Sequence, residues 1–359
     1  EDSLSVRVEP GITFYELDRV LEERGYTTLV EPENIYGCVG GAVMAAGSGW
    51  GTHGPGASNQ GDMVLGLRIV LPSGELLTTG SMVSPWIKKQ FYRYAFASDL
   101  TGLFVGSEGT LGIAVEVALK VEELPRGRRF AVYEFDDLDA AADVLIAMRR
   151  ARVSTVYAYL ATGWTLDILY PDKAPWKHRL RIIVVTPTEK QADLEMDRLN
   201  DIIGSKGRYQ GPAEAEVLWR EKDAWVREFA YKAGMRAALP IMVPIGKAKE
   251  YLKFYQSLVK YVGERYGLRM GVGSHITDRS FLAILAIYFN PSDADERRRA
   301  VAAWNDVKLR VLESGALTHT SGGLWSDQMP RMGTFYETLR IIKAALDPNG
   351  IMSPGMLGL

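Results

Sequence analysis

The stretch Asp99–Ile113 reads DLTGLFVGSEGTLGI and contains four glycines. Residues 37–66, which come before it, are also rich in glycine. Glycine permits positive backbone φ angles and lets the main chain approach a ligand closely. Consecutive free N–H groups in such loops can bind phosphate or the polar edge of a heterocycle. Two interpretations are therefore open: tight turns in a β-rich domain, or loops that hold a ligand.

Composition excludes several classes of protein. The 359 residues are 47% hydrophobic and 24% charged, which is typical of a globular protein of two or three domains. Lys and Arg total 42 and Asp and Glu total 44, without a long run of one sign, so no nucleic-acid surface is expected. The single cysteine, Cys38, excludes a disulfide framework and a Cys-rich metal site. Neither Gly-x-Gly-x-x-Gly after a strand nor a Walker motif occurs.

No apolar stretch approaches the ~20 residues of a membrane span and no signal peptide is recognised, so the cytoplasm is the expected compartment.

Hydrophobic periodicity divides the chain into three regions. Residues 1–125 favour short strands between turns, residues 128–315 alternate strands with helices, and residues 316–359 favour turns around one helix. The alternation predicts a sheet with helices packed on one face. The clearest expected elements are the strands Ser5–Val8, Phe130–Glu134, Ser154–Leu160, Arg181–Thr186 and Phe281–Phe289, the helices Asp136–Arg149, Glu189–Ile203, Lys247–Tyr266, Asp293–Ser314 and Met332–Ala345, and a helix after Thr13 that places Leu17, Val20 and Leu21 on one face.

The stretch Asp99–Ile113 closely resembles a segment of the FAD-linked oxidases of the vanillyl-alcohol oxidase and p-cresol methylhydroxylase superfamily. Within that superfamily it resembles the glycolate oxidase and D-lactate dehydrogenase branch. Other stretches agree with the family in the same order along the chain: Val6–Gly11, Gly37–Gly49, Val64–Gly74 and Asp347–Gly355. The resemblance spans the whole chain, strongly at both ends and weakly in residues 128–310.

The resemblance implies an α+β fold in which a cap domain interrupts a split FAD-binding domain. Residues 1–125 would form a partial FAD-binding domain whose N-terminal subdomain is missing, and residues 126–315 a cap with a mostly antiparallel sheet covered by helices. Residues 316–359 would return to the FAD-binding domain. In such a PCMH-type domain, backbone groups of the two glycine-rich segments hold the cofactor. The residues that carry over are Gly37, Gly40, Gly41, Ala46, Gly47, Gly106, Ser107, Gly109, Gly112 and Ile113.

The sequence departs from the family at two places. The family's phosphate loop precedes the strand matched by Val6–Glu9, where this sequence begins, so a complementing N-terminal fragment or subunit is expected. The family's metal-binding motif reads His275–Leu282 here, with Leu282 in place of its second histidine, and its later Gly-Glu-His-Gly reads Ser321–Trp325. His275 and Asp278 alone provide too few ligands, so no catalytic metal is expected. Leu324 and Trp325 would suit an aromatic or apolar substrate.

Four side chains are candidates for catalysis. His275 and His319 lie where the family places groups that face the flavin, and His319 would take the proton of an alcohol or phenol. Tyr157 and Tyr159 alternate on an expected strand and so share one face. The tyrosines could line the substrate pocket or simply be core aromatic residues, and the histidines could be structural.

The expected function is that of an FAD-dependent oxidoreductase that oxidises an alcohol, phenol or hydroxy acid by hydride transfer to flavin. Two alternatives remain: a metal-independent D-2-hydroxy-acid dehydrogenase, and a non-catalytic flavin-fold subunit of a complex. The expected partners are a small-molecule substrate and an electron acceptor, which would be oxygen, a quinone or a redox protein. A homo-oligomer is also expected, without nucleic acid and without a membrane span.

Overall fold

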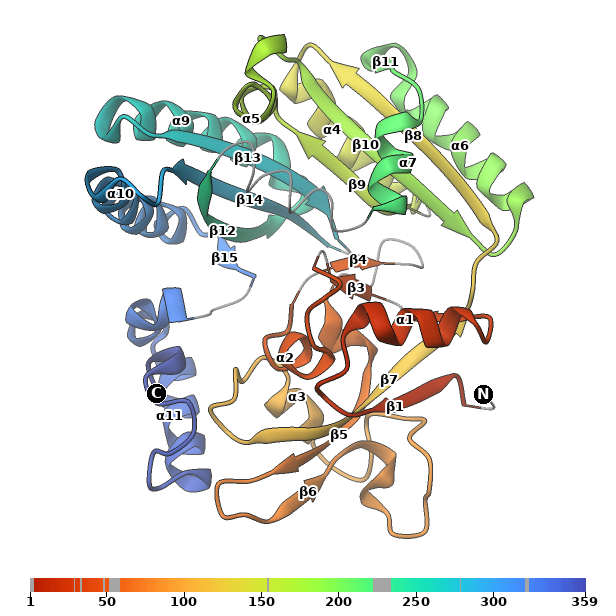
Figure 1. Ribbon diagram of the computed structural model, residues 1–359, viewed down its shortest axis with the longest axis vertical. Helices are drawn as coiled ribbons and strands as arrows, with labels where there is room; N and C mark the ends of the chain where they lie inside the picture. The colour runs from red at the N-terminus through yellow and green to blue at the C-terminus, as the bar shows by residue number, and fades with distance from the viewer. Residues whose placement is uncertain are drawn as a thin grey trace. The chain divides into compact units, whose positions relative to one another are not determined.

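The computed structural model describes residues 3–28, 30–32, 34–47, 49–51, 59–153, 155–221, 234–277, 279–319 and 323–359. The chain divides into two compact units (Figure 1). The first unit comprises Glu1–Trp50, Ala57–Leu124 and Thr320–Leu359, and the second comprises Gly51–Gly56 and Pro125–His319.

The first unit is built around a five-stranded antiparallel sheet of order β1-β7-β5-β6, in which β2 also pairs with β7. The long strand β7 therefore holds the sheet together. A small sheet of β3 and β4 accompanies it. The strands are β1 (Ser5–Val8), β2 (Tyr26–Thr28), β3 (Val30–Pro32), β4 (Gly49–Gly51), β5 (Val64–Val70), β6 (Leu76–Thr78) and β7 (Ile113–Glu123), and the helices are α1 (Phe14–Glu22), α2 (Val39–Met44), α3 (Leu100–Phe104) and α11 (Thr334–Leu346).

Helix α1 begins where its sequence provides a capping box. The Thr13 hydroxyl accepts a hydrogen bond from Glu16 N at 3.2 Å, and the Glu16 carboxylate accepts one from Thr13 N at 2.9 Å. Val20 is 45% exposed, so the expectation that it lies on the buried face is wrong. Asp18 takes that position because its carboxylate accepts a hydrogen bond from the Thr28 hydroxyl. The buried face carries Phe14, Leu17, Asp18 and Leu21.

The second unit is an eight-stranded sheet of order β11-β8-β10-β9-β13-β14-β12-β15, and its pairings are antiparallel. The expectation of a mostly antiparallel sheet covered by helices is confirmed. The strands are β8 (Gly127–Phe135), β9 (Thr155–Ala161), β10 (His178–Thr186), β11 (Arg208–Tyr209), β12 (Met235–Pro244), β13 (Arg269–Ile276), β14 (Ser280–Phe289) and β15 (Leu317–Thr318). The helices are α4 (Leu138–Arg150), α5 (Gly163–Leu169), α6 (Glu189–Ile203), α7 (Ala213–Arg220), α9 (Ala248–Tyr266) and α10 (Ala294–Glu313).

Burial differs between strand β12 near one edge of this sheet and the strands in its middle. Helices α4, α6, α9 and α10 contact one another and the sheet. In β12, buried Leu239, Ile241 and Val243 alternate with the partly exposed residues between them. The residues of β12 on the face of the long helices are therefore buried and the opposite ones partly exposed, whereas β10, β13 and β14 have buried residues in succession and are covered on both faces. Among the described residues, no helix is both long enough and apolar enough to cross a bilayer.

Candidate active site

The two glycine-rich segments meet within the first unit. Glu108 N donates a hydrogen bond to Met44 O at 2.9 Å, and a Cβ atom on Gly106 would lie 3.3 Å from that of Ala46. Together with residues of the C-terminal segment they line an open cavity of about 440 Å³. The cavity is lined by Pro10, Gly40, Gly41, Met44, Gly109, Gly112, Ile113, Ala114, Ile351, Met352 and Ser353.

The glycines around this cavity are needed for different physical reasons. Gly109 has a φ of 76°, in the left-handed region that side chains disfavour. A Cβ atom on Gly40 would lie 2.4 Å from Pro10 Cβ, so that glycine permits close packing of the chain on itself. A Cβ atom on Gly41 would meet nothing within 4 Å, although Gly41 lines the cavity. Gly41 is therefore the position where a side chain would enter the cavity without disturbing the fold.

Of the other expected flavin contacts, Gly112 and Ile113 also line the cavity, and packing explains several of the glycines. Gly106, like Gly109, has a positive φ, and Ile113 is 57% exposed. Added Cβ atoms would crowd the chain's own atoms at three more glycines. These are Gly37 against Asn34 O, Gly47 against Gln60 Oε1 and Gly112 against Ile69 Cγ2.

Buried polar atoms test whether these residues fit a flavin. Ser107 is 5% exposed and Gln60 is 1% exposed, and within the described part of the chain the Ser107 hydroxyl and both polar atoms of the Gln60 amide have no hydrogen-bond partner. Buried polar groups are normally paired, so unpaired ones in the two glycine-rich segments indicate a polar ligand, although neither residue is among those that line the cavity. The ring system of FAD carries the matching donors and acceptors, and the residues fit it. Sequence reasoning missed Gln60, since its only signal is its place in the glycine-rich stretch.

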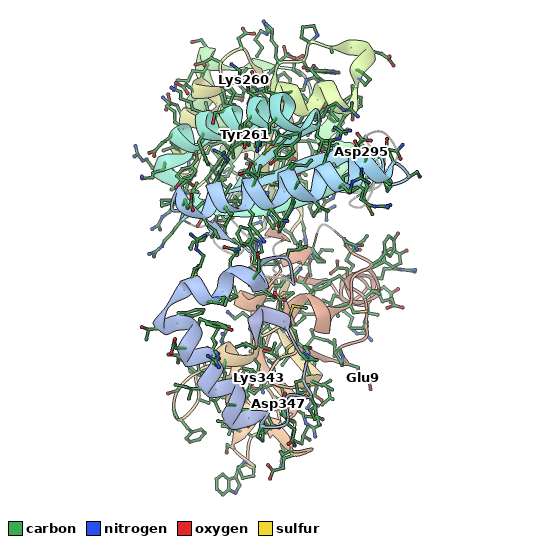
Figure 2. The ribbon with its side chains drawn as sticks, turned by 90° about the vertical axis from the view of Figure 1, so that its left-hand side faces the viewer. Glu9, Lys260, Tyr261, Asp295, Lys343 and Asp347 are labelled. Atoms are coloured by element: carbon green, nitrogen blue, oxygen red, sulfur yellow. The ribbon has the colours of Figure 1, made fainter. Side chains whose placement is uncertain are left out.

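A buried ion pair joins Lys343 of α11 to Asp347 just after the helix (Figure 2), and Lys343 also contacts the glycine-rich segment. Lys343 Nζ donates to Asp347 Oδ2 at 2.5 Å, to Thr110 O at 2.9 Å and to Met352 O at 2.7 Å. The pKa of Asp347 is lowered, because hydrogen bonds from Lys343 and from the N–H groups of Met352 and Ile351 outweigh its burial. Sequence reasoning missed this pair, for which the spacing of four residues was the available signal.

In the second unit, three of the four expected catalytic residues are buried and in contact on one face of the sheet. Tyr157 and Tyr159 stack with ring centroids 5.6 Å apart and planes 2° from parallel. The ring of His275 lies 6.4 Å from that of Tyr157, and His275 is the cross-strand partner of Tyr159. His319 N donates to Pro240 O at 3.0 Å, and its ring is close enough to affect the titration of His275.

Both imidazoles are neutral at pH 7 and have unused hydrogen-bonding capacity. Burial, reinforced by the neighbouring His319, lowers the pKa of His275 to about 4. Burial also lowers the pKa of His319. Within the described residues, neither ring nitrogen of either histidine has a hydrogen-bond partner. A buried neutral imidazole with a free nitrogen can accept a proton from a bound hydroxyl group.

Gly273 makes room for the tyrosine pair and was missed by sequence reasoning. A Cβ atom on Gly273 would lie 1.6 Å from the hydroxyl oxygen of Tyr159, so any side chain there would displace the ring. The available signal was the alternation of Gly271, Gly273 and His275, which places all three on one face of β13.

The residues of the degenerate metal-binding motif are only partly described. Leu282 on β14 is the direct partner of His275 on β13, so an apolar side chain stands beside the imidazole. In the described part of the chain, no group of three or more His, Cys, Asp or Glu side chains is placed to hold a metal ion. Asp278 and residues 320–322 lie outside the described residues. Trp325 is buried at 3% exposure, whereas Leu324 is 59% exposed.

Two family models match the chain. A model described as "FAD linked oxidases, C-terminal domain" matches residues 124–357, and one described as "FAD binding domain" matches residues 1–80. Curated relatives include a mitochondrial D-lactate dehydrogenase (cytochrome) of Arabidopsis thaliana, 28% identical over 99% of this chain and 62% of the relative. A glycolate oxidase subunit of Bacillus subtilis is 23% identical over 99% of this chain and 76% of the relative. The chain thus spans less than two thirds of the first of these relatives.

A solved structure shares the fold. The crystal structure of p-cresol methylhydroxylase with substrate bound superposes with a TM-score of 0.86 at 18% identity, and the match covers all of this chain and 76% of that one.

Proposed function

The chain belongs to the FAD-linked oxidases, and from this premise we propose that it is an oxidoreductase that oxidises an alcohol, a phenol or a hydroxy acid. The observation that carries the proposal is the buried His275 beside two stacked tyrosines, with the partly buried His319 close to it. His275 and His319 have no hydrogen-bond partner among the described residues, and the lowered pKa of each keeps its imidazole neutral. Such a pair is suited to accept the proton that a hydroxyl group loses on oxidation.

Different residues of the chain would have different roles in the reaction. FAD, when bound, supplies the acceptor for the hydride that leaves the substrate carbon. His319 or His275 would take the hydroxyl proton on a ring nitrogen. Tyr157 and Tyr159 would form one wall of the substrate site, held in place by their stacking and by the absence of a side chain at Gly273. Backbone groups around Gly41, Gly106 and Gly109 would hold the cofactor.

Hydroxy acids are the first substrate class to test, because the names of the two curated relatives refer to D-lactate and glycolate. Phenols are the second, because the flat stacked pair of Tyr157 and Tyr159 matches an aromatic ring. The proposal requires no metal ion. A further segment or subunit that completes the FAD site stays a prediction.

Anaerobic reduction of bound FAD tests the proposal. The protein is loaded with FAD and mixed with D-lactate, glycolate or 4-cresol, and loss of flavin absorbance is followed. We expect one substrate class to reduce the flavin. His275→Gln and His319→Gln are expected to retain FAD, and loss of the proton acceptor should slow reduction by roughly 10²–10⁴-fold. Absence of reduction by all three compounds, or full rates in both variants, would contradict the proposal.

The electron acceptor, the assembly and the compartment form a separate part of the proposal. Oxygen, a quinone or a redox protein would reoxidise the flavin, and the chain would form a homo-oligomer in the cytoplasm. Turnover measured with each acceptor in parallel, light scattering after gel filtration, and fractionation of the source cells test these three points.

A further inference from the structure

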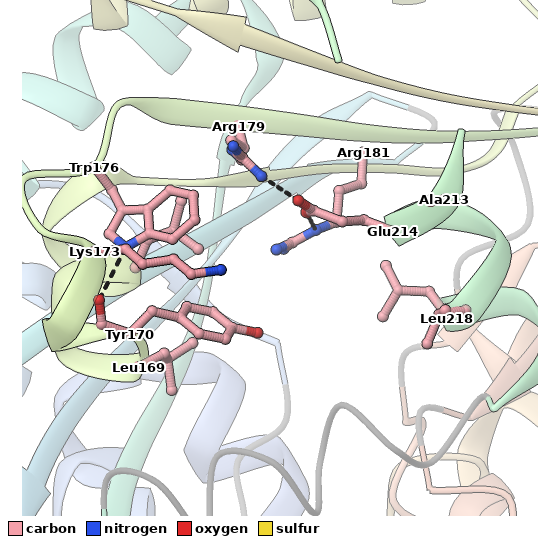
Figure 3. A pocket seen from close by; sticks show the side chains of 11 residues that line it. Leu169, Tyr170, Lys173, Trp176, Arg179, Arg181, Ala213, Glu214 and Leu218 are labelled. Atoms are coloured by element: carbon pink, nitrogen blue, oxygen red, sulfur yellow. Dashed lines mark hydrogen bonds and ion pairs between the residues drawn. The ribbon is translucent and has the colours of Figure 1, made fainter. Parts of the chain in front are cut away.

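A second cavity lies within the second unit, between β10, α5 and α7 (Figure 3). Its volume of about 370 Å³ is in the range of small-molecule sites. Three cationic side chains and one carboxylate line it, namely Lys173, Arg179, Arg181 and Glu214. The proposed chemistry does not use any of them.

Arg181 is the residue that distinguishes this cavity from an ordinary ion-pair cluster. Its Nε donates to Glu214 Oε2 at 3.0 Å, and the residue is only 7% exposed. Its Nη1 is buried and, within the described residues, has no hydrogen-bond acceptor. Figure 3 shows the guanidinium end of Arg181 beyond the bond to Glu214, directed into the space that faces Tyr170. A buried charged donor without an acceptor is expensive to maintain, so an acceptor is expected in this space.

Arg179 is a second arginine whose guanidinium has a donor without an acceptor. It pairs with Glu214 through one terminal nitrogen and lies 3.5 Å from Glu134 through the other. Its Nε is buried and has no acceptor among the described residues. Glu214 is thus shared between two arginines and does not satisfy both of them. One more carboxylate in the cavity would complete the set of hydrogen bonds.

The rest of the cavity wall is aromatic and apolar. The Trp176 indole N–H donates to Tyr170 O at 3.0 Å, which fixes the ring, and the Arg179 guanidinium stands 4.4 Å from the ring centroid of Trp176. Leu169 and Leu218 contribute apolar surface. The wall therefore suits a ligand with one anionic end and one apolar or aromatic end.

We propose that this cavity binds an organic monocarboxylate with an apolar or aryl tail. The carboxylate accepts hydrogen bonds from Arg181 Nη1 and Arg179, and the tail lies against the leucines. Arg181 is the cross-strand partner of Tyr159, which in turn is the partner of His275, so the cavity and the proposed catalytic residues share one face of the sheet. The inference concerns binding only and stands whether or not the chain oxidises the ligand.

Titration calorimetry on the full chain tests the proposal with phenylacetate as the probe and phenylacetamide as its neutral counterpart. We expect saturable one-site binding of phenylacetate and at least about tenfold weaker binding of the amide, since the amide lacks the charge. Arg181→Met should weaken phenylacetate binding by about tenfold or more. Arg129→Met is the matched control, because Arg129 of the neighbouring strand β8 pairs with Glu189 and Asp193, which do not line the cavity. It should leave binding unchanged.

A second variant keeps the test valid if Arg181→Met does not fold. Val217 lines the cavity and is 40% exposed, so Val217→Trp should fill the cavity without disturbing the core, and it should abolish phenylacetate binding. Circular dichroism checks that each variant is folded. Three results would each overturn the proposal: equal binding of acid and amide, unchanged binding in both cavity variants, or no saturable binding of phenylacetate at millimolar concentration.

Discussion

At the scale of single residues, the cavity of the first unit depends on glycines that are not equivalent. Gly109 is required for its backbone angle, because a φ of 76° is strained for any residue with a side chain. Gly41 has an open environment and lies in helix α2, where glycine is the weaker choice for stability. Glycine is therefore needed for the backbone conformation at position 109, whereas at position 41 it leaves space for a ligand.

This difference leads to a paired prediction. Gly109→Val should lose FAD and also lose stability, by about 1–3 kcal/mol of backbone strain. Gly41→Leu should weaken FAD binding strongly while the melting temperature stays the same or rises, because the side chain enters the cavity and improves helix propensity. Fluorescence titration with FAD and thermal unfolding of the apoprotein measure the two effects. A Gly41→Leu protein that binds FAD like the parent would place the flavin elsewhere.

The second residue-scale prediction concerns pH. The pKa of His275 is lowered to about 4, whereas in the unfolded chain it returns to about 6.5. Between these values the unfolded state binds more protons than the folded state, so the free energy of unfolding falls as the pH drops from 6.5 to 4. The loss should reach up to about 3 kcal/mol. Urea unfolding across this range should show a smaller decline in His275→Gln, and identical pH profiles for the two proteins would contradict the assignment.

At the scale of elements, helix α11 holds the cavity together by a polar contact. Lys343 is the buried residue of this helix, and it connects Thr110 with Met352. Lys343→Met should lower the melting temperature by roughly 5 °C or more and should speed amide exchange in residues 107–112, because it leaves Asp347 buried without its cation.

The control for this prediction is a pair with the same spacing on the surface. Lys260 and Glu264 of α9 are 3.7 Å apart and mostly exposed, so Lys260→Met should have little effect. Replacing Lys343 and Asp347 together by apolar residues should restore part of the stability, as is common for buried ion pairs. Equal effects of Lys343→Met and Lys260→Met would show that the buried contact does not hold the segment.

The pairing of β13 with β14 leads to a prediction about metals. Because Leu282 is the neighbour of His275, the strands bring together only one imidazole and an apolar group at this position. Treatment with a chelator should therefore leave flavin reduction intact. Lost activity that a divalent cation restores would reinstate a metal-dependent hydroxy-acid dehydrogenase.

At the scale of the whole molecule, the family expectation and FAD as its cofactor are confirmed by the matches to the two family models. FAD should raise the melting temperature of the chain in a concentration-dependent way, because a ligand that binds only the folded state contributes about 2.7 kcal/mol at a hundred times its Kd. Differential scanning fluorimetry across FAD concentrations measures this effect. A melting temperature that does not respond to FAD would favour the non-catalytic subunit instead.

Local sequence signals were enough to predict the elements whose ends are set by neighbouring residues. Helix α6 spans the expected Glu189–Ile203 because Thr188 and Gln191 form a capping box at its start. Strand β13 was missed because Gly271 and Gly273 weaken the strand pattern. It is a strand because its neighbours β9 and β14 pair with it on both sides.

The amino-acid sequence was enough for the family, for FAD and for the mostly antiparallel sheet, because segments such as Asp99–Ile113 resemble those of known FAD-linked oxidases. Helix caps and periodicity, which act over a few residues, were enough for most of the helices. The sequence also named the four candidate catalytic residues, whose roles remain predictions. The contacts between distant side chains could be found only in the folded chain. Lys343 contacts Thr110, which is 233 residues away, and Arg181, Tyr159 and His275 are cross-strand neighbours in one row of the sheet. These contacts depend on strand register and on burial, which bring together residues that are far apart in the sequence.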